Sequence, residues 1–245
     1  MNEQEQQKLT VPGAIILAGV IIAIAVIYTG GNKSGTTTEV QNPPDLEAQK
    51  KEQQAKLADS LKPVSPDEHI LGNPNAPVKI VEFSDIECPF CKRFHPTMHQ
   101  IMDEYGKDGK VAWVYRHFPL SIHPKATPEA EAAECVWEQG GNELFWKYLD
   151  ALFEASATNN QTDDAVPSQV AKKLAVDMDK YTKCVTARTY QTKVQADVKD
   201  GLAAGVSGTP YSIVIAPNGK KFPINGALPY ESVKIVIDLA LKEVK

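Results

Sequence analysis

The sequence has little excess of charge of either sign. Its 245 residues include 26 Lys and Arg against 31 Asp and Glu, which gives a formal net charge of −5. Proteins that bind a phosphate backbone need a positive surplus, so this balance argues against nucleic-acid binding. Hydrophobic residues make up 42% of the chain. That is enough for a sizeable core in one or two domains and excludes disorder throughout.

Cysteine is scarce as well, with four in the whole chain. That number is too small for a small fold held together by disulfides. Cys88 and Cys91 form a C-x-x-C pair, whereas Cys135 and Cys184 stand alone. A second C-x-x-C is missing, although structural zinc sites usually require one or a pair of histidines at ligand spacing. The close pair is therefore the first candidate for chemistry.

One long segment lacks charged residues altogether. Residues 11–28 read VPGAIILAGVIIAIAVIY. At ~1.5 Å per residue, a helix of this length spans roughly 27 Å, close to the thickness of a bilayer core. No Ala-x-Ala cleavage site follows the run, so we expect an uncleaved transmembrane anchor rather than a signal peptide. Lys and Arg are nearly balanced on its two flanks, which therefore do not orient it.

Apolar residues are sparse between residues 29 and 66. The first part, residues 29–44, is rich in Gly, Ser, Thr and Asn and ends in two prolines, which predicts a flexible tether. Asp45 is suited to cap a short helix that is polar on most faces. We expect a solvated stalk helix here, because the alternative of a coiled coil lacks enough apolar heptads. The folded domain is predicted over residues 67–245.

The folded domain shows an α/β pattern. The apolar segment 78–84 predicts a buried strand, a helical pattern follows it, and residues 110–118 predict a second strand, so a parallel crossover is expected. From about residue 125 to 204 the patterns are helical, with a break at a Gly-Gly pair. Two strands joined by a Pro-Asn-Gly-Lys turn and a helix over Tyr230–Val244 close the domain. The prediction is an α/β domain with a helical insertion.

The C-x-x-C pair lies at the junction of the first strand and its helix. This places Cys88 at a helix N-terminus, where free backbone N–H groups and the helix dipole favour a thiolate. Pro89 suits the first helical turn because it has no N–H group to lose. Cys91 follows one turn later, within reach to form a disulfide with Cys88 or to resolve a mixed one.

The stretches VEFSDIECPFC and GVSGTP resemble the thioredoxin superfamily, and specifically its DsbA-like thiol–disulfide oxidoreductases. The resemblance extends from about Gly72 to the C-terminus. It implies a thioredoxin fold in which the helical insertion separates a βαβ half from a C-terminal ββα half. It also implies that Cys88 is an exposed nucleophile, that Cys91 is the buried resolving thiol, and that Pro210 is a cis-proline facing both.

The resemblance assigns roles to further residues around the pair. A cis bond at Pro210 would leave the Thr209 backbone open to pair with an extended substrate, and we expect Thr209, Pro89 and Phe90 to contact it. Phe90 stands where the best-known family members have His. The resemblance therefore does not decide whether the redox potential of the dithiol is that of an oxidase or of a reductase. Glu82 matches a buried carboxyl of the family, whose raised pKa would let it exchange a proton with Cys91.

The remaining cysteines and histidines have simpler explanations. The resemblance implies a structural disulfide between Cys135 and Cys184, and the alternative is a pair of buried thiols. His95 and His99 are expected at the surface rather than in a metal site. For the two histidines that flank the loop after the second strand, packing or capping is favoured over catalysis. These are His117 and His123.

Together these features predict a membrane-tethered thiol–disulfide oxidoreductase that introduces disulfides into reduced or unfolded extracytoplasmic proteins. We expect a cytoplasmic tail at residues 1–10, a single-pass anchor in the cell membrane, and a catalytic domain outside the cytoplasm. The resemblance implies a membrane partner, quinone-linked, that reoxidises the dithiol. No cofactor and no metal are expected.

The residues leave two alternative functions open. A disulfide reductase or isomerase would use the same dithiol, with its electrons supplied by a membrane reductant. A metal-carrier module would hold copper or zinc between the two sulfurs, with His95 nearby. A purely structural, inert disulfide is disfavoured, because a favoured thiolate makes the oxidised pair unstable.

Overall fold

The computed structural model describes residues 43–243. The predicted cytoplasmic tail, the anchor at residues 11–28 and most of the tether lie outside this part of the chain. Among residues 43–243, no helix combines the length and the apolar character needed to cross a bilayer.

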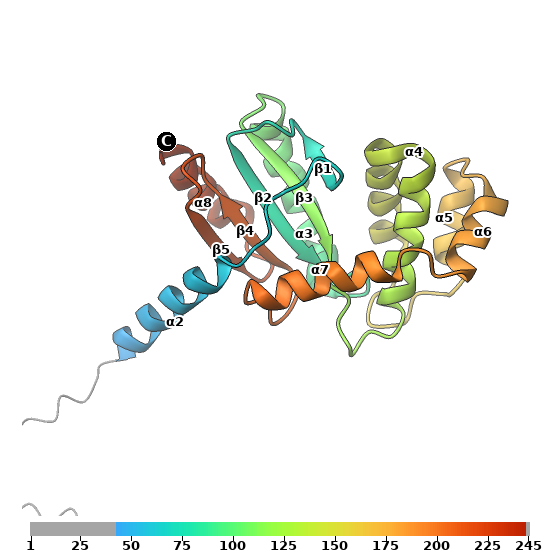
Figure 1. Ribbon diagram of the computed structural model, residues 1–245, viewed down its shortest axis with the longest axis horizontal. Coiled ribbons are helices and arrows are strands. Elements are labelled where there is room, and N and C mark those ends of the chain that lie inside the picture. Colours follow the sequence, from blue (N-terminus) through green and yellow to red (C-terminus); the bar gives the residue numbers. More distant parts are fainter. Residues whose placement is uncertain (1–42, 244–245) are drawn as a thin grey trace, which may run out of the picture. The chain divides into compact units, whose positions relative to one another are not determined.

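Strands and helices alternate in the first half of the described chain, helices alone fill its middle, and a hairpin and helix end it (Figure 1). In chain order the elements are α2 (Pro43–Ala58), β1 (His69–Gly72), β2 (Val78–Ser84), α3 (Pro89–Ile101), a π-helical turn η1 (Met102–Gly106), β3 (Val111–His117), α4 (Ala126–Ala155), α5 (Val166–Lys173), α6 (Met178–Thr186), α7 (Gln191–Ala203), β4 (Tyr211–Ile215), β5 (Lys221–Asn225) and α8 (Tyr230–Lys242).

The strands form one mixed sheet in the order β1-β3-β2-β4-β5. β2 pairs with β3 in parallel, and α3 is the crossover between them, as predicted. β4 runs antiparallel to β2 and forms a hairpin with β5. The predicted thioredoxin fold, with α4 to α7 inserted between a βαβ half and a ββα half, is confirmed. The short strand β1, antiparallel to β3, was not predicted.

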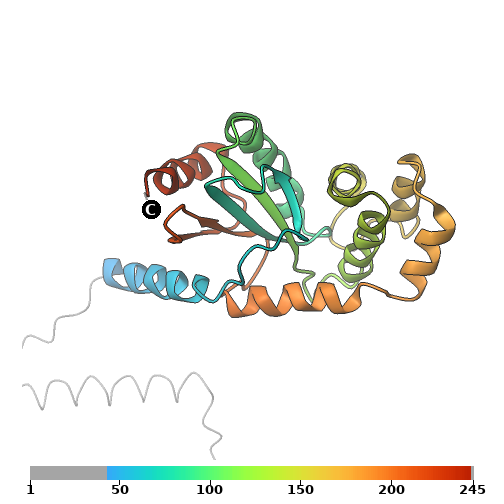
Figure 2. The same ribbon diagram turned by 45° about the horizontal axis from the view of Figure 1, so that its top comes forward.

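Hydrophobic side chains cover both faces of the sheet. Because strand side chains alternate, Ile80 and Val214 point into the core under α3 and α8, whereas Val81 and Ile213 point into a second core. The second core also takes in Val206, just after α7. Figure 2 shows α7 along one face of the sheet and α3 and α8 along the other. Burial on both faces explains why the central strands are continuous apolar runs.

The long helix α4 consists of two arms. Gly141 interrupts it with φ 61° and ψ −155°, a conformation that glycine adopts without a side-chain clash. The predicted break at the Gly-Gly pair is therefore confirmed. In both arms buried residues such as Ala133 and Leu149 face the main core, so the insertion and the sheet share one hydrophobic interior.

The stalk helix α2 differs from its prediction at its end. Its described side chains are mostly exposed, but Ala58, its last residue, and Leu61, just after it, are 0% and 5% exposed and belong to the second core. The Lys62 N–H also donates to the Asp200 carboxylate of α7 at 3.0 Å. The expectation of a helix solvated throughout is wrong here, because two apolar residues one turn apart suffice to pack on the sheet.

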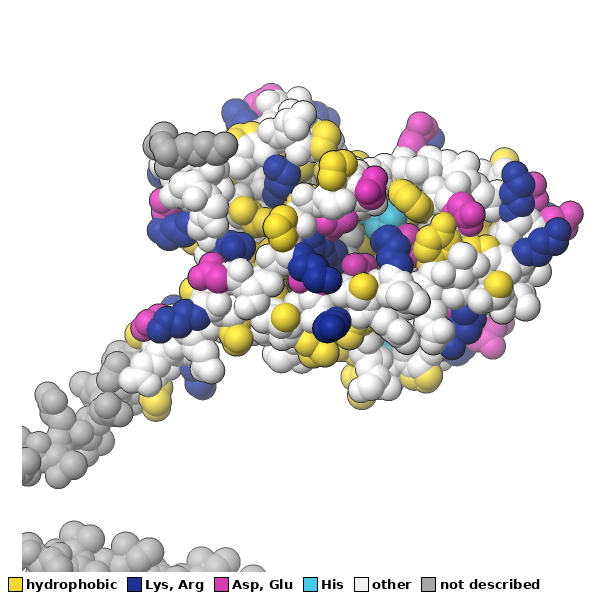
Figure 3. All heavy atoms as spheres, viewed as in Figure 1, with side chains coloured by type: hydrophobic (Ala, Val, Ile, Leu, Met, Phe, Trp, Pro, Cys, Tyr) yellow, Lys and Arg dark blue, Asp and Glu magenta, His cyan; other side chains and the backbone are white. Residues whose placement is uncertain are grey.

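Charged side chains of both signs are interspersed over the face shown in Figure 3. Neither sign forms a continuous patch on that face. This distribution agrees with the near balance of charges in the sequence.

Candidate active site around Cys88 and Cys91

The dithiol lies where β2 ends and α3 begins. Cys88 is the N-cap of α3, with φ −80° and ψ 121°, and Pro89 occupies the first helical turn. The Lys92 N–H closes that turn by donating to the Cys88 carbonyl at 3.0 Å. The free N–H groups of this turn are directed at the first sulfur, which favours negative charge on it.

The Cys88 thiol meets a segment from the other half of the fold. Its Sγ lies 3.4 Å from the Thr209 carbonyl oxygen, and the Thr209–Pro210 bond is cis. Cys88 is 3% exposed. The expectation of an exposed nucleophile is therefore wrong for the residue as a whole, because the Thr209–Pro210 segment lies against it.

The pKa values of the two thiols are shifted in opposite directions. A hydrogen bond from the Cys91 thiol is the main cause that lowers the pKa of Cys88 to about 6, and the Thr209 hydroxyl acts in the same direction. Burial raises the pKa of Cys91 well above its usual value, and the interaction with Cys88 raises it further. Cys91 is 0% exposed, and its Sγ accepts the Asp85 N–H at 3.4 Å. Cys88 is thus the thiolate and Cys91 the protonated thiol near neutral pH.

Glu82 lies on β2, in the interior behind the dithiol. It is 1% exposed, and burial raises its pKa to about 7 against opposing interactions with Ser84 and Trp113. Its charge raises the pKa of Cys91, and the Ser84 hydroxyl is close enough to lower the pKa of both groups. In the described residues, neither Ser84 Oγ nor Glu82 Oε2 has a hydrogen bond of ordinary geometry. A carboxyl with this pKa can take or return a proton near neutral pH.

The loop before Cys88 contains two buried acids that the sequence analysis did not single out. Asp85 accepts hydrogen bonds from the Glu87 N–H, the Leu120 N–H and His123 Nδ1, each at 2.8 Å. Asp85 therefore ties the dithiol loop to the segment after β3, and His123 orients the carboxylate. The sequence feature that could have indicated them is the pair of acidic residues, Asp85 and Glu87, on both sides of Ile86 directly before the C-x-x-C motif.

Glu87 interacts in turn with Glu129 on α4. Burial and then the Glu87 carboxylate raise the pKa of Glu129 to about 9, so Glu129 carries a proton at neutral pH. The Asn160 N–H donates to Glu87 Oε2 from the loop after α4. Glu87, directly before Cys88 in the chain, is thus coupled to a second protonatable group, Glu129, which the helical insertion supplies.

The surface beside the dithiol is partly apolar. The Phe90 ring is 53% exposed and lies under the Arg93 guanidinium, 5.1 Å from the ring centroid. The Gly226 N–H donates to the Pro210 carbonyl at 3.0 Å and holds the next loop against the cis-proline. A pocket of about 350 Å³ lies between this loop and α3. Its lining residues are Arg93, Phe94, Thr97, Ala227, Leu228 and Pro229.

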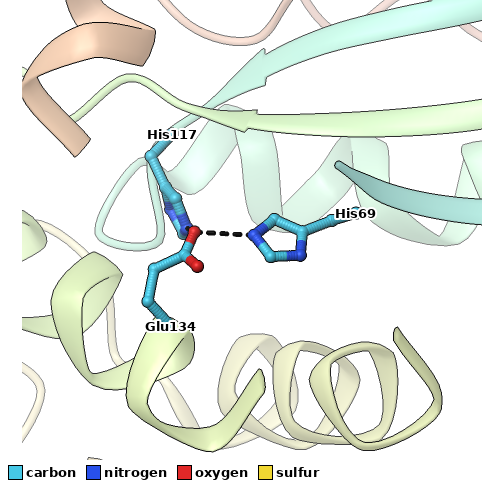
Figure 4. Close-up of side chains that lie close together, drawn as sticks. All are labelled: His69, His117 and Glu134. Carbon is cyan, nitrogen blue, oxygen red and sulfur yellow. Dashed lines mark hydrogen bonds and ion pairs between the residues drawn. The ribbon is translucent and has the colours of Figure 1, made fainter. Parts of the chain in front are cut away.

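The other predicted residues lie away from the dithiol. A disulfide joins Cys135 of α4 to Cys184 of α6, with a Cα–Cα distance of 5.9 Å. His117 packs at the end of β3, where Glu134 Oε1 lies 3.1 Å from its Nε2 and 2.6 Å from His69 Nε2 (Figure 4). In the described residues, neither the Cys88 nor the Cys91 sulfur belongs to a group of three potential metal ligands.

Comparison with known proteins identifies the family of this fold. A family model described as thioredoxin matches residues 64–239. The probable disulfide bond formation protein D of Bacillus cereus is 31% identical over 179 residues, which cover 71% of this chain and 78% of that protein. The crystal structure of Pseudomonas aeruginosa DsbA2 matches with a TM-score of 0.64 at 26% identity, covering 75% of this chain and 99% of that one.

A further relative is a much longer protein. The Na(+)/H(+) antiporter NhaA 3 of Salinispora tropica is 34% identical over 167 residues, or 67% of this chain. The chain spans about a quarter of the length of the antiporters that it matches, 24% for this one. The thioredoxin match, in contrast, takes in both halves of the fold and the insertion between them. With its dithiol at a helix N-terminus opposite a cis-proline, the chain belongs to the thioredoxin family, in the DsbA-like branch of thiol–disulfide oxidoreductases.

Proposed function

We propose that this protein introduces disulfides into reduced or unfolded extracytoplasmic proteins, by passing on a disulfide between Cys88 and Cys91. The observation that carries the proposal is the opposite shift of the two thiol pKa values, lowered to about 6 for Cys88 and raised for Cys91. A stable Cys88 thiolate favours the reduced form of the dithiol and so makes the disulfide a better oxidant.

The reaction begins with the oxidised protein. A substrate thiolate attacks Cys88 Sγ, the Cys88–Cys91 bond breaks, and a mixed disulfide forms while Cys91 leaves as a thiolate. Because burial raises the pKa of Cys91, this thiolate takes up a proton, which Glu82 can supply.

A second substrate thiolate then attacks the substrate sulfur of the mixed disulfide. Cys88 leaves as a thiolate, and its low pKa makes it a good leaving group. The substrate has lost two electrons and gained a disulfide, and the protein holds those electrons as its dithiol. Another protein must remove them before the next cycle.

Substrate binding is assigned to the surface around the dithiol. The backbone of Thr209 borders Cys88 and is suited to pair with an extended chain. Phe90, Pro89 and the pocket lined by Leu228 offer apolar contacts to an unfolded substrate. These contacts need little sequence specificity, which suits a protein that acts on many clients.

The location outside the cytoplasm is part of the proposal. Structural disulfides persist in oxidising compartments, and the Cys135–Cys184 bond is consistent with one. The uncharged run at residues 11–28 would tether the domain, with residues 1–10 in the cytoplasm. A quinone-linked membrane protein is then the proposed reoxidant, because both partners would lie at the same membrane surface.

An oxidation assay tests the proposed activity. The chain is purified with the Cys88–Cys91 disulfide formed and mixed with a reduced, unfolded protein, and loss of substrate thiols is followed. We expect about one substrate disulfide per oxidised chain, and none from the Cys88→Ser variant. If the reduced chain instead cleaves insulin disulfides while the oxidised chain leaves reduced protein unchanged, the protein is a reductase and the proposal is wrong.

The location has its own test. In a Glu231→Cys variant, the new thiol lies at an exposed position of α8. Intact cells are treated with a membrane-impermeant maleimide. Labelling before lysis is expected, whereas labelling only after lysis would contradict a domain outside the cytoplasm.

A further inference from the structure

Two groups of histidines and a carboxylate lie outside the dithiol site in the described residues. The buried group consists of His69, His117 and Glu134 (Figure 4). Its carboxylate already has a cation, because Lys193 Nζ lies 2.5 Å from Glu134 Oε1 and 3.1 Å from His69 Nε2. The lysine ammonium occupies the place that a metal ion would need, so this group is a closed ion-pair network.

The surface group consists of His95, His99 and Asp150. The two histidines lie one turn apart on α3, and Asp150 comes from the second arm of α4. Asp150 Oδ1 lies 2.7 Å from His95 Nε2 and 2.8 Å from His99 Nε2, and the two nitrogens are 3.2 Å apart. Three potential ligand atoms from two helices therefore converge on one point.

The spacing of these atoms suits a small divalent metal ion. Zinc binds imidazole nitrogen and carboxylate oxygen at about 2.0–2.1 Å, which places tetrahedral ligand atoms roughly 3.3 Å from one another. The observed separations of 2.7, 2.8 and 3.2 Å would widen by about 0.6, 0.5 and 0.1 Å to reach this value. Two imidazoles and one carboxylate are also the ligands of known zinc sites with an open fourth position.

The surface group has no competing cation and is open to solvent. Among the described residues, Asp150 forms ion pairs with His95 and His99 alone. The side chains of His99 and Asp150 are 37% and 45% exposed, which gives an ion a path of entry.

The support behind the site is rigid. The expectation that His95 lies at the surface is wrong: it is 6% exposed and packs against Phe153, with ring centroids 4.6 Å apart, and against Trp113 at 5.2 Å. One ligand is therefore fixed by the core and the other two adjust from the surface. This arrangement lowers the conformational entropy lost on binding an ion.

We propose that His95, His99 and Asp150 form a zinc-binding site in which a water molecule is the fourth ligand, separate from the Cys88–Cys91 dithiol. The ion would join α3, which carries the dithiol, to α4 of the helical insertion. Zinc bound only to the folded protein would then raise its unfolding temperature in proportion to the logarithm of its concentration.

The test must keep zinc away from the thiols. The chain, without a histidine tag, is stripped of metal and held with the Cys88–Cys91 disulfide formed, and Zn²⁺ is titrated by calorimetry. We expect one ion per chain, and cobalt(II) in its place should give the visible absorption of a tetrahedral site without thiolate bands. His99→Gln and Asp150→Asn should each weaken zinc binding roughly tenfold or more.

Two matched variants separate the possible sites. Asp108→Asn removes an exposed carboxylate elsewhere, and His117→Gln removes a potential ligand of the buried group. Both should leave zinc affinity unchanged, with folding checked by circular dichroism. Absence of binding at millimolar zinc, unchanged affinity in His99→Gln, or loss of binding in His117→Gln would each overturn the proposal.

Discussion

The Cys88 thiol lies 3.4 Å from the carbonyl oxygen of Thr209, a residue 121 positions further along the chain. The C-x-x-C motif alone therefore does not complete the site. β4 pairs with β2 and brings the Thr209–Pro210 segment to the start of α3. The reactive sulfur and the backbone proposed to hold a substrate are thus positioned by one pair of strands.

Exchange is expected to depend on the two sulfurs in different ways. Cys88→Ser should abolish formation of mixed disulfides, because Cys88 is the thiolate near neutral pH. Cys91→Ser should keep the first attack but lose the resolving thiol, so mixed disulfides with substrates accumulate. Non-reducing gels followed by mass spectrometry measure both outcomes. Full exchange activity in Cys88→Ser would contradict the assignment of the nucleophile.

The rate at which Cys91 resolves a mixed disulfide should depend on pH through the protonation of Glu82. In a preformed mixed disulfide between Cys88 and glutathione, Cys91 must lose its proton to attack. With Glu82 as base, the rate of glutathione release should rise with pH and level off above about pH 7, the pKa of Glu82. In Glu82→Gln the rate at pH 7 should fall about a hundredfold and the levelling should disappear. The exposed Glu143→Gln serves as control, and an unchanged profile in Glu82→Gln would remove Glu82 from the mechanism.

The same carboxyl should affect stability. Its pKa is about 7 in the folded chain and 4.5 in its unperturbed state, so the folded state holds the proton more tightly. The free energy of unfolding should therefore fall as pH rises from about 4.5 to 7. Glu82→Gln should be more stable than the parent at pH 8, by up to about 3 kcal/mol, and nearly equal at pH 4. Urea unfolding at both pH values measures this, and equal stability at pH 8 would contradict the burial of an ionisable carboxyl.

The disulfide in the insertion should act on stability rather than on exchange. Cys135 and Cys184 are 49 residues apart, and in the chain-entropy model closing a loop of that length stabilises the fold by about 4 kcal/mol. The Cys135→Ala, Cys184→Ala double variant should unfold at lower urea concentration and retain exchange at 25 °C. A loss of exchange in a variant that is still folded would mean that this bond takes part in the reaction.

A buried ion-pair network should hold the segment after α2 to the sheet. Arg116 Nη1 lies 2.5 Å from Asp200 and its Nε 2.7 Å from Glu68. Arg116→Met leaves the Asp200 carboxylate buried without its partner, which costs about 3–5 kcal/mol. Chemical denaturation against the surface control Lys147→Met should show this difference. Similar stability of the two variants would contradict the network.

Much of the fold could be predicted from local patterns. The strand at residues 78–84, the helix after it and the closing hairpin follow from apolar periodicity and turn residues, and the structure has them at nearly the same positions. The strand His69–Gly72 was missed because it is short and lies at a sheet edge, where pairing with β3 rather than its own pattern forms it.

The features of the site also fall into those that local sequence predicts and those that it does not. The C-x-x-C motif and its place at a helix N-terminus are local and were recognisable. The burial of Cys88, the hydrogen bonds of Asp85 to His123, and the raised pKa of Glu129 depend on contacts across 38 or more residues. Such contacts are set by tertiary packing, and single-sequence patterns carry no signal for them.

The redox potential of the Cys88–Cys91 pair tests the central claim most directly. Equilibration of the chain in glutathione buffers, with Zn²⁺ absent, gives the fraction of disulfide at each ratio. Because the pKa of Cys88 is lowered to about 6, we expect a potential above about −200 mV, in the range of protein disulfide isomerase and DsbA. A value below about −200 mV, most clearly one near about −270 mV as in thioredoxin, would contradict an oxidase.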